Sequence, residues 1–384
     1  MIYLDHNATS PLRPEAAAAV ARALEIGGNP SSVHAMGRAA RTVIENARET
    51  VAAFAGAAPG EVIFTSGGAE SNALALRGAV LSATETGEPV TRLFVQGTAH
   101  DSVRAVAASL AETVPGLHVS EIAVDANGRV DQRKFRAQLT NGGGRSLVSL
   151  MSVNNETGVF EDIGSLAKLI RDEGNALIHV DGVSSGYCPI AFREWDADYL
   201  SISAHKLGGP QGTGALIVKD GAPLAPLIDG FQEMRRRGGT ENVSGIAGFG
   251  AAVRTLQANR EEEVARVKAV RDSFEKTVVN LGAIVFAKDA ERAPNTTCFA
   301  IPGLSAETAL MALDLDGICV SSGAACSSGK VGRSHVLKAM GVPDDLARCA
   351  LRVSFGWNST QEDADACIAS LEKLLARISA RKAA

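Results

Sequence analysis

The sequence has few aromatic side chains, no long apolar run and no excess of basic charge. Its 384 residues include 12 Phe, 3 Tyr and 2 Trp, and no stretch approaches the roughly 18 consecutive apolar residues that a membrane-spanning helix requires. The first residues, MIYLDHNATSPL, reach Asp5 and His6 too early for the apolar segment of a signal peptide. The 38 basic and 43 acidic residues give a formal net charge of −5 without a basic block. We therefore expect no membrane span and no nucleic-acid or anionic-membrane surface, and we favour a small-molecule partner.

Cysteine is also scarce. The six cysteines include no CxxC pair and are too sparse for a secreted disulfide scaffold, which predicts reduced thiols in a cytoplasmic protein. We assign no metal site. Cys326 is treated apart, and the other five are expected to be small, buried, apolar side chains. These five are Cys188, Cys298, Cys319, Cys349 and Cys367.

In the first two thirds of the chain, apolar runs of strand length alternate with helical patterns. Most of these runs are near-continuous rather than alternating, which is typical of strands buried on both faces. The pattern predicts an α/β domain with a mostly parallel, mixed, seven-stranded sheet covered by helices. The predicted strands are 61–65, 92–96, 118–124, 146–153, 177–181, 199–203 and 215–219.

The last third of the chain changes character. The acidic run at Glu261 precedes apolar residues spaced by three and four, which predicts a helix that begins there. A final helix is predicted to open with a capping box from Ser359 to Glu362. We predict a large domain over 14–257 and a small α+β domain that combines 1–13 with 258–384. The strands of the small domain are expected near 283–287, 297–301, 318–321 and 351–354.

Polar residues where strands end are the first candidates for chemistry, because ligands of open α/β sheets gather there. The segment TSGGAESN, residues 65–72, is a glycine-rich turn that opens a helix, and its N–H groups could hold a phosphate. Sterically required glycines would explain the same turn. Asp181 ends an apolar strand, where it would either cap the next turn or face a cationic ligand atom.

Lys206 follows another strand, among Ser, Ala and Gly residues that shield its amine little. Such a lysine suits Schiff-base chemistry, although a surface lysine in a glycine loop would look the same. Cys326 lies within SSGAACSSGK, where no large apolar side chain would bury it. An exposed thiol on a Ser/Gly loop is a liability unless it is used, so we favour a functional thiol.

Three further positions stay open at this point. His100 could begin a helix or act as an acid or base, and the segment around Asn155 could be a turn. Arg352 is flanked by strand residues, so its charge needs an anionic partner if it is buried. That partner would be a structural carboxylate or the carboxylate of a substrate.

Taken in order, these segments resemble the cysteine desulfurases of the nitrogen-fixation and iron–sulfur-assembly type, which are class V aminotransferase-like, fold-type-I enzymes. The resemblance runs nearly end to end. It includes LDHNATSPLRPEA, GNPSSVHAMGR, TSGGAESNALAL, MSVNNETGV, HVDGVSS, SISAHKLGGPQGTGAL, RRRGGTENVSGI, APNTTCFAIPG, SSGAACSSGK and LRVSFG.

The resemblance implies a large domain that binds pyridoxal 5′-phosphate. Lys206 would hold this cofactor covalently and remove the Cα proton of the substrate, while Asp181 would keep the pyridinium nitrogen protonated. His100 would lie over the ring and assist proton transfer, and Arg352 would grip the substrate carboxylate. Thr240 would reach the cofactor from the neighbouring subunit of a homodimer, and Asn155 would contact both the cofactor and the substrate. The other positions implied to contact the cofactor are Gly68, Ala69, Ser184, Ser203 and His205.

Cys326 would distinguish a desulfurase from other enzymes of this fold. The resemblance implies that it attacks the sulfur of L-cysteine, releases L-alanine and carries a persulfide to an acceptor or iron–sulfur scaffold protein. The rival interpretations are a selenocysteine lyase, a class V aminotransferase, and a scaffold protein impaired in catalysis. The sequence departs from the family at Ala69, Ser184, Phe231 and Met234, where Thr, Gln, Gly and Arg are common.

Overall fold

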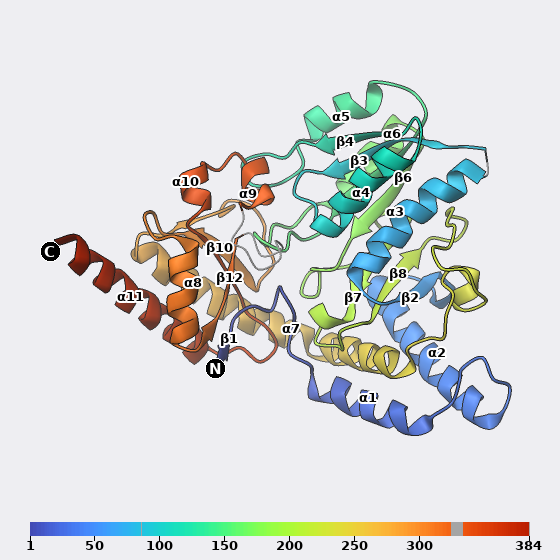
Figure 1. The fold of residues 1–384 in the computed structure, drawn as a ribbon, viewed down its shortest axis with the longest axis horizontal. Helices are drawn as coiled ribbons and strands as arrows, with labels where there is room; N and C mark the ends of the chain where they lie inside the picture. The colour runs from blue at the N-terminus through green and yellow to red at the C-terminus, as the bar shows by residue number, and fades with distance from the viewer. Residues whose placement is uncertain (86, 324–332, 384) are drawn as a thin grey trace.

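A seven-stranded sheet forms the centre of the larger part of the molecule (Figure 1). The computed structural model describes residues 1–85, 87–323 and 333–383. The strand order is β2-β8-β7-β6-β5-β3-β4, and β8 alone runs antiparallel to its neighbours. The predicted mostly parallel, mixed sheet is thus confirmed. Its strands are β2 Val62–Thr65, β3 Val90–Gln96, β4 His118–Ile122, β5 Arg145–Met151, β6 Ala176–Asp181, β7 Tyr199–Ser203 and β8 Gly214–Val218.

Helices cover both faces of this sheet. Apolar residues of α3 and α4 form one core layer with the strands, and residues of α2, α5, α6 and α7 form the other. α1 packs against α7 and α2. The bounds are α1 Pro14–Ile26, α2 Ala35–Ala55, α3 Gly68–Glu85, α4 Asp101–Thr113, α5 Gln132–Thr140, α6 Ile163–Glu173 and α7 Val243–Asn280, with 3-10 turns at η1 Pro59–Glu61, η2 Ala204–Lys206 and η3 Glu233–Arg235.

A four-stranded antiparallel sheet, ordered β12-β13-β10-β9, stands beside this assembly, together with the parallel pair β1-β11. Its apolar core takes residues from α7, α8 and α11. The predicted strand 318–321 is in fact two short strands in different sheets, separated at Val320. The bounds are β1 Ile2–Tyr3, β9 Ile284–Val285, β10 Thr296–Ala300, α8 Ala306–Leu315, β11 Ile318–Cys319, β12 Ser321–Ser322, α9 His335–Ala339, α10 Asp344–Ala347, β13 Ala350–Ser354 and α11 Gln361–Ala383.

Two helix starts differ from the prediction. α7 begins at Val243, where the Asn242 side chain accepts a hydrogen bond from the Gly245 amide, so the acidic run at Glu261 lies inside the helix. The final helix is capped by a reciprocal pair between Thr360 and Asp363, one residue beyond the predicted box. No helix within the described residues is long and apolar enough to cross a membrane.

One helix, α7, belongs to both cores. Its first half packs in the core of the large sheet, for example through Phe249, and its second half packs in the core of the small sheet, for example through Phe274. The predicted boundary at residue 257 falls within this helix, and the division into domains stays a prediction. Four of the five cysteines expected to be buried are buried, whereas Cys319 is only half-buried.

Candidate active site

A cavity of about 310 Å³ lies where strands β5, β6 and β7 end. Parallel strands bring their carboxyl ends to one edge of a sheet, so residues far apart in sequence meet there. Nine of the twelve predicted site residues line this cavity: Gly68, Ala69, His100, Asn155, Asp181, Ser184, His205, Lys206 and Arg352. The structure therefore brings most of the candidates together, while their roles stay predictions.

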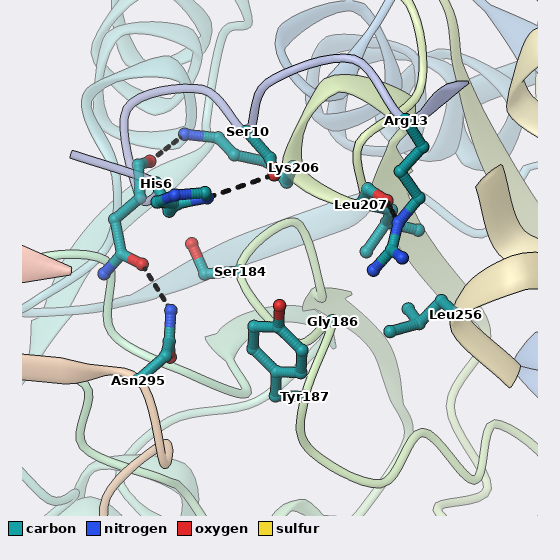
Figure 2. Close-up of a pocket in the computed structure, with 11 residues that line it drawn as sticks. His6, Ser10, Arg13, Ser184, Gly186, Tyr187, Lys206, Leu207, Leu256 and Asn295 are labelled. Carbon is teal, nitrogen blue, oxygen red and sulfur yellow. Dashed lines mark hydrogen bonds between the residues drawn. The ribbon is translucent and has the colours of Figure 1, made fainter. Parts of the chain in front are cut away.

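Lys206 lies in the short turn η2 that follows β7. Its Nζ atom donates to the backbone oxygen of Asn7 (Figure 2) and, at 2.9 Å, to that of Ala8. A second, smaller cavity of about 30 Å³ shares Asn7, Ser184 and Lys206 with the larger one. The amine thus lies at the junction of two hollows, held by the N-terminal segment.

Asp181 ends β6 and is buried. Its Oδ2 atom accepts a hydrogen bond from Asn72 Nδ2 at 3.0 Å, and its Oδ1 atom accepts one from the Val183 amide at 3.1 Å. A buried carboxylate that faces a cavity favours a cationic group opposite it, such as a protonated ring nitrogen.

His100 caps the N-terminus of α4. Its Nδ1 atom accepts a hydrogen bond from the Ser102 amide at 3.1 Å and lies 2.9 Å from Ser102 Oγ. Asn72 Nδ2 donates to the same Ser102 oxygen at 3.0 Å. The helix-start interpretation of His100 is therefore confirmed, and the residue also lines the cavity.

Arg352 brings positive charge to the cavity wall from β13, and only 1% of the residue is exposed. Its Nη1 atom donates to the Asn155 backbone oxygen at 2.9 Å, and its Nη2 atom donates to Asp5 Oδ1 at 2.6 Å. The structural carboxylate is thus present, and the guanidinium still lines the cavity, where it could bind the carboxylate of a small molecule.

The glycine-rich turn has the features of a phosphate cradle. α3 begins at Gly68, and its first amides have no partners within the helix. Ser203 Oγ is buried beside Gly67, and none of the described residues hydrogen-bonds it. Burial and, less strongly, the Lys206 charge lower the pKa of His205 to about 4, so its imidazole is neutral. An unpaired hydroxyl at the positive end of a helix fits a phosphate oxygen.

Two predicted residues lie elsewhere. Thr240 lines a separate depression of about 110 Å³ rather than the cavity around Lys206, and its action from a neighbouring subunit stays a prediction. Cys326 lies outside the described residues.

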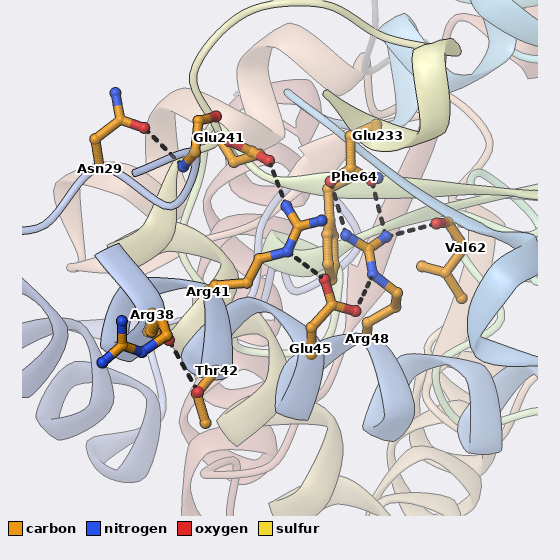
Figure 3. A network of polar contacts seen from close by, with 11 residues as sticks. Asn29, Arg38, Arg41, Thr42, Glu45, Arg48, Val62, Phe64, Glu233 and Glu241 are labelled. Carbon is orange, nitrogen blue, oxygen red and sulfur yellow. Dashed lines mark hydrogen bonds and ion pairs between the residues drawn. The ribbon is translucent and has the colours of Figure 1, made fainter. Parts of the chain in front are cut away.

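The family departures at Phe231 and Met234 lie on the surface of this chain. Between them, the Glu233 carboxylate points inward to Arg48 of α2 and to the Phe64 amide (Figure 3). Glu233, Met234 and Arg235 all have positive φ angles, a conformation that non-glycine residues rarely adopt. The buried ion pair holds this turn in place.

Sequence reasoning missed several residues that line the cavity, and Asn7 and Asn72 matter most among them. Asn72 lies one helical turn after Gly68, so helical spacing from the glycine turn could have found it. Asn7 carried no such signal, because it reaches the cavity only through the pairing of the N-terminal segment with β11 and with Ser354.

Comparisons with known proteins agree with this geometry. Residues 2–367 match the class-V aminotransferase family. The chain is 38% identical over 382 residues to the cysteine desulfurase IscS of Dictyoglomus turgidum, covering 98% of this chain and 95% of that protein. It is 40% identical to a cysteine desulfurase of Cereibacter sphaeroides, with 99% and 97% covered. Its fold resembles a NifS-like protein from Rickettsia africae at a TM-score of 0.87 and 32% identity, with 98% and 99% covered.

Proposed function

This chain belongs to the class-V aminotransferase family, and on that basis we propose that it is a pyridoxal-phosphate-dependent cysteine desulfurase. It converts L-cysteine to L-alanine and passes the sulfur on as a persulfide of Cys326. The observation that carries this function is the meeting of Lys206, Asp181, His100 and Arg352 in one cavity. Full-length similarity to proteins named cysteine desulfurase supports the choice of reaction.

The residues present fit the cofactor. Lys206 would hold it covalently, Asp181 would pair with its ring nitrogen, and Ser203 with the first amides of α3 would hold its phosphate. When bound, the cofactor supplies an electron sink that lets the substrate lose its Cα proton and then its sulfur. Ala69 brings no hydroxyl to the phosphate, so the backbone amides and Ser203 carry that contact.

The protein side chains divide the remaining work. Arg352 binds the substrate carboxylate, which orients the Cα–H bond toward Lys206. Lys206 Nζ then takes the Cα proton. The Cys326 thiolate attacks the substrate sulfur, so an S–S bond forms as the C–S bond breaks. The bonding electron pair stays with the carbon fragment, which takes up one proton at Cβ, regains one at Cα and leaves as alanine.

The wider setting is part of the same proposal. The protein is a cytoplasmic homodimer in which Thr240 of one subunit completes the phosphate site of the other. The Cys326 persulfide serves a sulfur acceptor or scaffold protein in iron–sulfur or thio-cofactor assembly. The names IscS and NifS among the similar proteins support the assignment to iron–sulfur assembly.

Replacing Cys326 with Ala tests the reaction. Alanine formation from cysteine should fall at least 100-fold, whereas the visible absorbance of the bound cofactor and its response to added cysteine should persist. Cys349→Ala, at a buried thiol, is the matched control and should leave the turnover rate within twofold.

Other outcomes would identify the rivals. Unchanged cysteine turnover in Cys326→Ala would overturn the mechanism. If Cys326→Ala lost turnover of cysteine but kept turnover of selenocysteine, the result would favour a selenocysteine lyase. A colourless wild-type protein that cannot be reconstituted with pyridoxal phosphate would favour the scaffold protein.

A further inference from the structure

The described residues on both sides of Cys326 are anchored near Arg352. The described chain stops at Gly323 and resumes at Arg333, and Cys326 lies between them in the sequence. On the first side, Ser321 of β12 pairs with Arg352 of β13. Because Arg352 lines the cavity, the last described residues before Cys326 lie beside the proposed binding site of the substrate carboxylate.

On the second side, Ser334 makes two hydrogen bonds through one hydroxyl. Its Oγ atom accepts from the Leu337 amide at 3.0 Å and so caps α9. The same hydroxyl donates its hydrogen to Glu156 Oε2, in the loop after β5. Glu156 and Ser334 are 178 positions apart and are 2% and 3% exposed. A buried bond thus joins the start of α9 to the large sheet.

A second contact between α9 and the large sheet lies close by. His335 Nε2 is 2.9 Å from the Ala99 backbone oxygen, and because that oxygen can only accept, the ring nitrogen donates. Ala99 directly precedes His100, and Glu156 directly follows Asn155. Since His100 and Asn155 line the cavity, these two hydrogen bonds attach the start of α9 to the cavity wall.

The acidic side chain of Glu156 is a costly way to hold a helix. Burial raises its pKa to about 7, although the hydrogen bond from Ser334 and the charge of Arg352 act to lower it. Among the residues that the structure describes, the Ser334 hydroxyl is the one donor to this carboxylate. Val336 and Leu337 already pack α9 into an apolar cluster. A costly buried group kept beside a cavity favours a role in the reaction over a role in stability alone.

Arg352 connects the two anchors. Its backbone pairs with Ser321, and its Nη1 atom donates at 2.9 Å to the backbone oxygen of Asn155, the residue before Glu156. The substrate carboxylate and the substrate sulfur belong to one small molecule. The distance from Arg352 to the attacking thiolate must therefore match the length of that molecule.

We propose that Glu156 and Ser334 are positioning residues for sulfur transfer. Their buried hydrogen bond fixes, relative to Arg352, the part of the chain that follows Cys326. It does not bind the substrate. The inference rests on the proposed function, because it assumes that the Cys326 thiolate takes the sulfur.

Ser334 gives the first test. Ser334→Ala removes the cap of α9 and the bond to Glu156, whereas Ser334→Thr keeps both. The matched control is Ser305→Ala, which removes a cap that stays within α8, where Ser305 Oγ accepts from the Thr308 amide at 3.3 Å. With holoenzyme in excess over cysteine, the rate of persulfide formation on Cys326 should fall about 30-fold in Ser334→Ala and stay within about twofold in the other two variants.

The affinity for cysteine separates positioning from a general disturbance of the site. We expect the cysteine concentration that half-saturates the change in visible absorbance to stay within about threefold of the wild-type value in all these variants. A loss of affinity as large as the loss of rate would contradict the proposal. An unchanged rate in Ser334→Ala would contradict it as well.

A double-variant cycle tests whether the two residues act through one bond. Glu156→Ala should slow persulfide formation as much as Ser334→Ala does, and the double variant should lose no more than about twofold beyond either single variant. Glu156→Gln keeps an acceptor oxygen and should recover most of the rate. Losses that multiply in the double variant would overturn the proposal. If Glu156→Ala does not fold, Ser334→Ala and its controls decide alone.

The two proposals can fail separately. A wild-type protein that forms no persulfide from cysteine would refute the proposed function and this inference with it. A wild-type protein that forms the persulfide, with a Ser334→Ala variant that forms it equally fast, would refute only the role given to Glu156 and Ser334.

Discussion

Two buried arginines, Arg48 in α2 and Arg352 in β13, show how differently one side chain can be used. Arg48 makes four hydrogen bonds, one to Glu45, one to the Val62 oxygen and a bidentate pair to Glu233, and its guanidinium lies over the Phe64 ring (Figure 3). Within the described residues, Arg352 makes two, and its Nε atom has no partner.

The difference indicates which arginine is available for a ligand. A guanidinium has five N–H donors, and nearly all of those of Arg48 form hydrogen bonds within its own chain. Arg352 is just as buried and lines the cavity, yet it has N–H donors without an acceptor among the residues that the structure describes. Unpaired buried donors are costly, so a protein that retains them at a cavity favours a ligand with matching acceptors. A carboxylate is such a ligand.

The largest effect is expected for Arg48, whose N–H donors are nearly all used in hydrogen bonds. Arg48→Met leaves the buried Glu233 carboxylate without its charge partner, which should lower the free energy of unfolding by about 3–5 kcal/mol in urea titrations. Arg41→Met, at a half-exposed arginine of the same network, is the control and should cost less than about 1 kcal/mol. Equal losses in the two variants would mean that burial does not decide the strength of these pairs.

The next largest effect is expected for Arg352, which lines the cavity. Arg352→Gln should lower kcat/KM for cysteine about 100-fold, equivalent to about 2.7 kcal/mol, because the substrate carboxylate loses its charge partner. The loss should nearly vanish with cysteamine, which lacks the carboxylate. If both compounds lost activity equally, Arg352 would support the structure of the site rather than bind the substrate.

The smallest effect is expected from removing the charge of Asp5, the ion-pair partner of Arg352. Asp5 offsets part of the Arg352 charge through the 2.6 Å ion pair. Asp5→Asn should therefore leave more positive charge for the substrate and lower KM for cysteine about threefold, or about 0.7 kcal/mol. Asp196→Asn, which removes an exposed partner of Arg171, should leave KM unchanged. A raised KM in Asp5→Asn would show that the ion pair mainly orients Arg352.

The sequence predicted what depends on neighbouring residues. All seven strands of the large sheet were found because their apolar runs are bounded by turns, and the 199–203 strand agrees with β7 at both ends. The start of α7 was missed because three acidic residues resemble a helix N-terminus, whereas the real cap is Asn242. The Glu233 turn and the Asp5 ion pair were also out of reach, because their partners lie 185 and 347 positions away.

The 38-residue helix α7 has a consequence for folding. At about 57 Å it is long enough to lie across both cores, and it contributes buried residues to each. Unfolding of either half of the helix would expose the apolar surface of the core against which that half packs. Lys206 follows the large sheet and Arg352 lies in the small one, so the helix that packs in both cores connects the two sides of the cavity. A substitution that weakens the packing of α7 in either core is therefore expected to disturb the cavity as well.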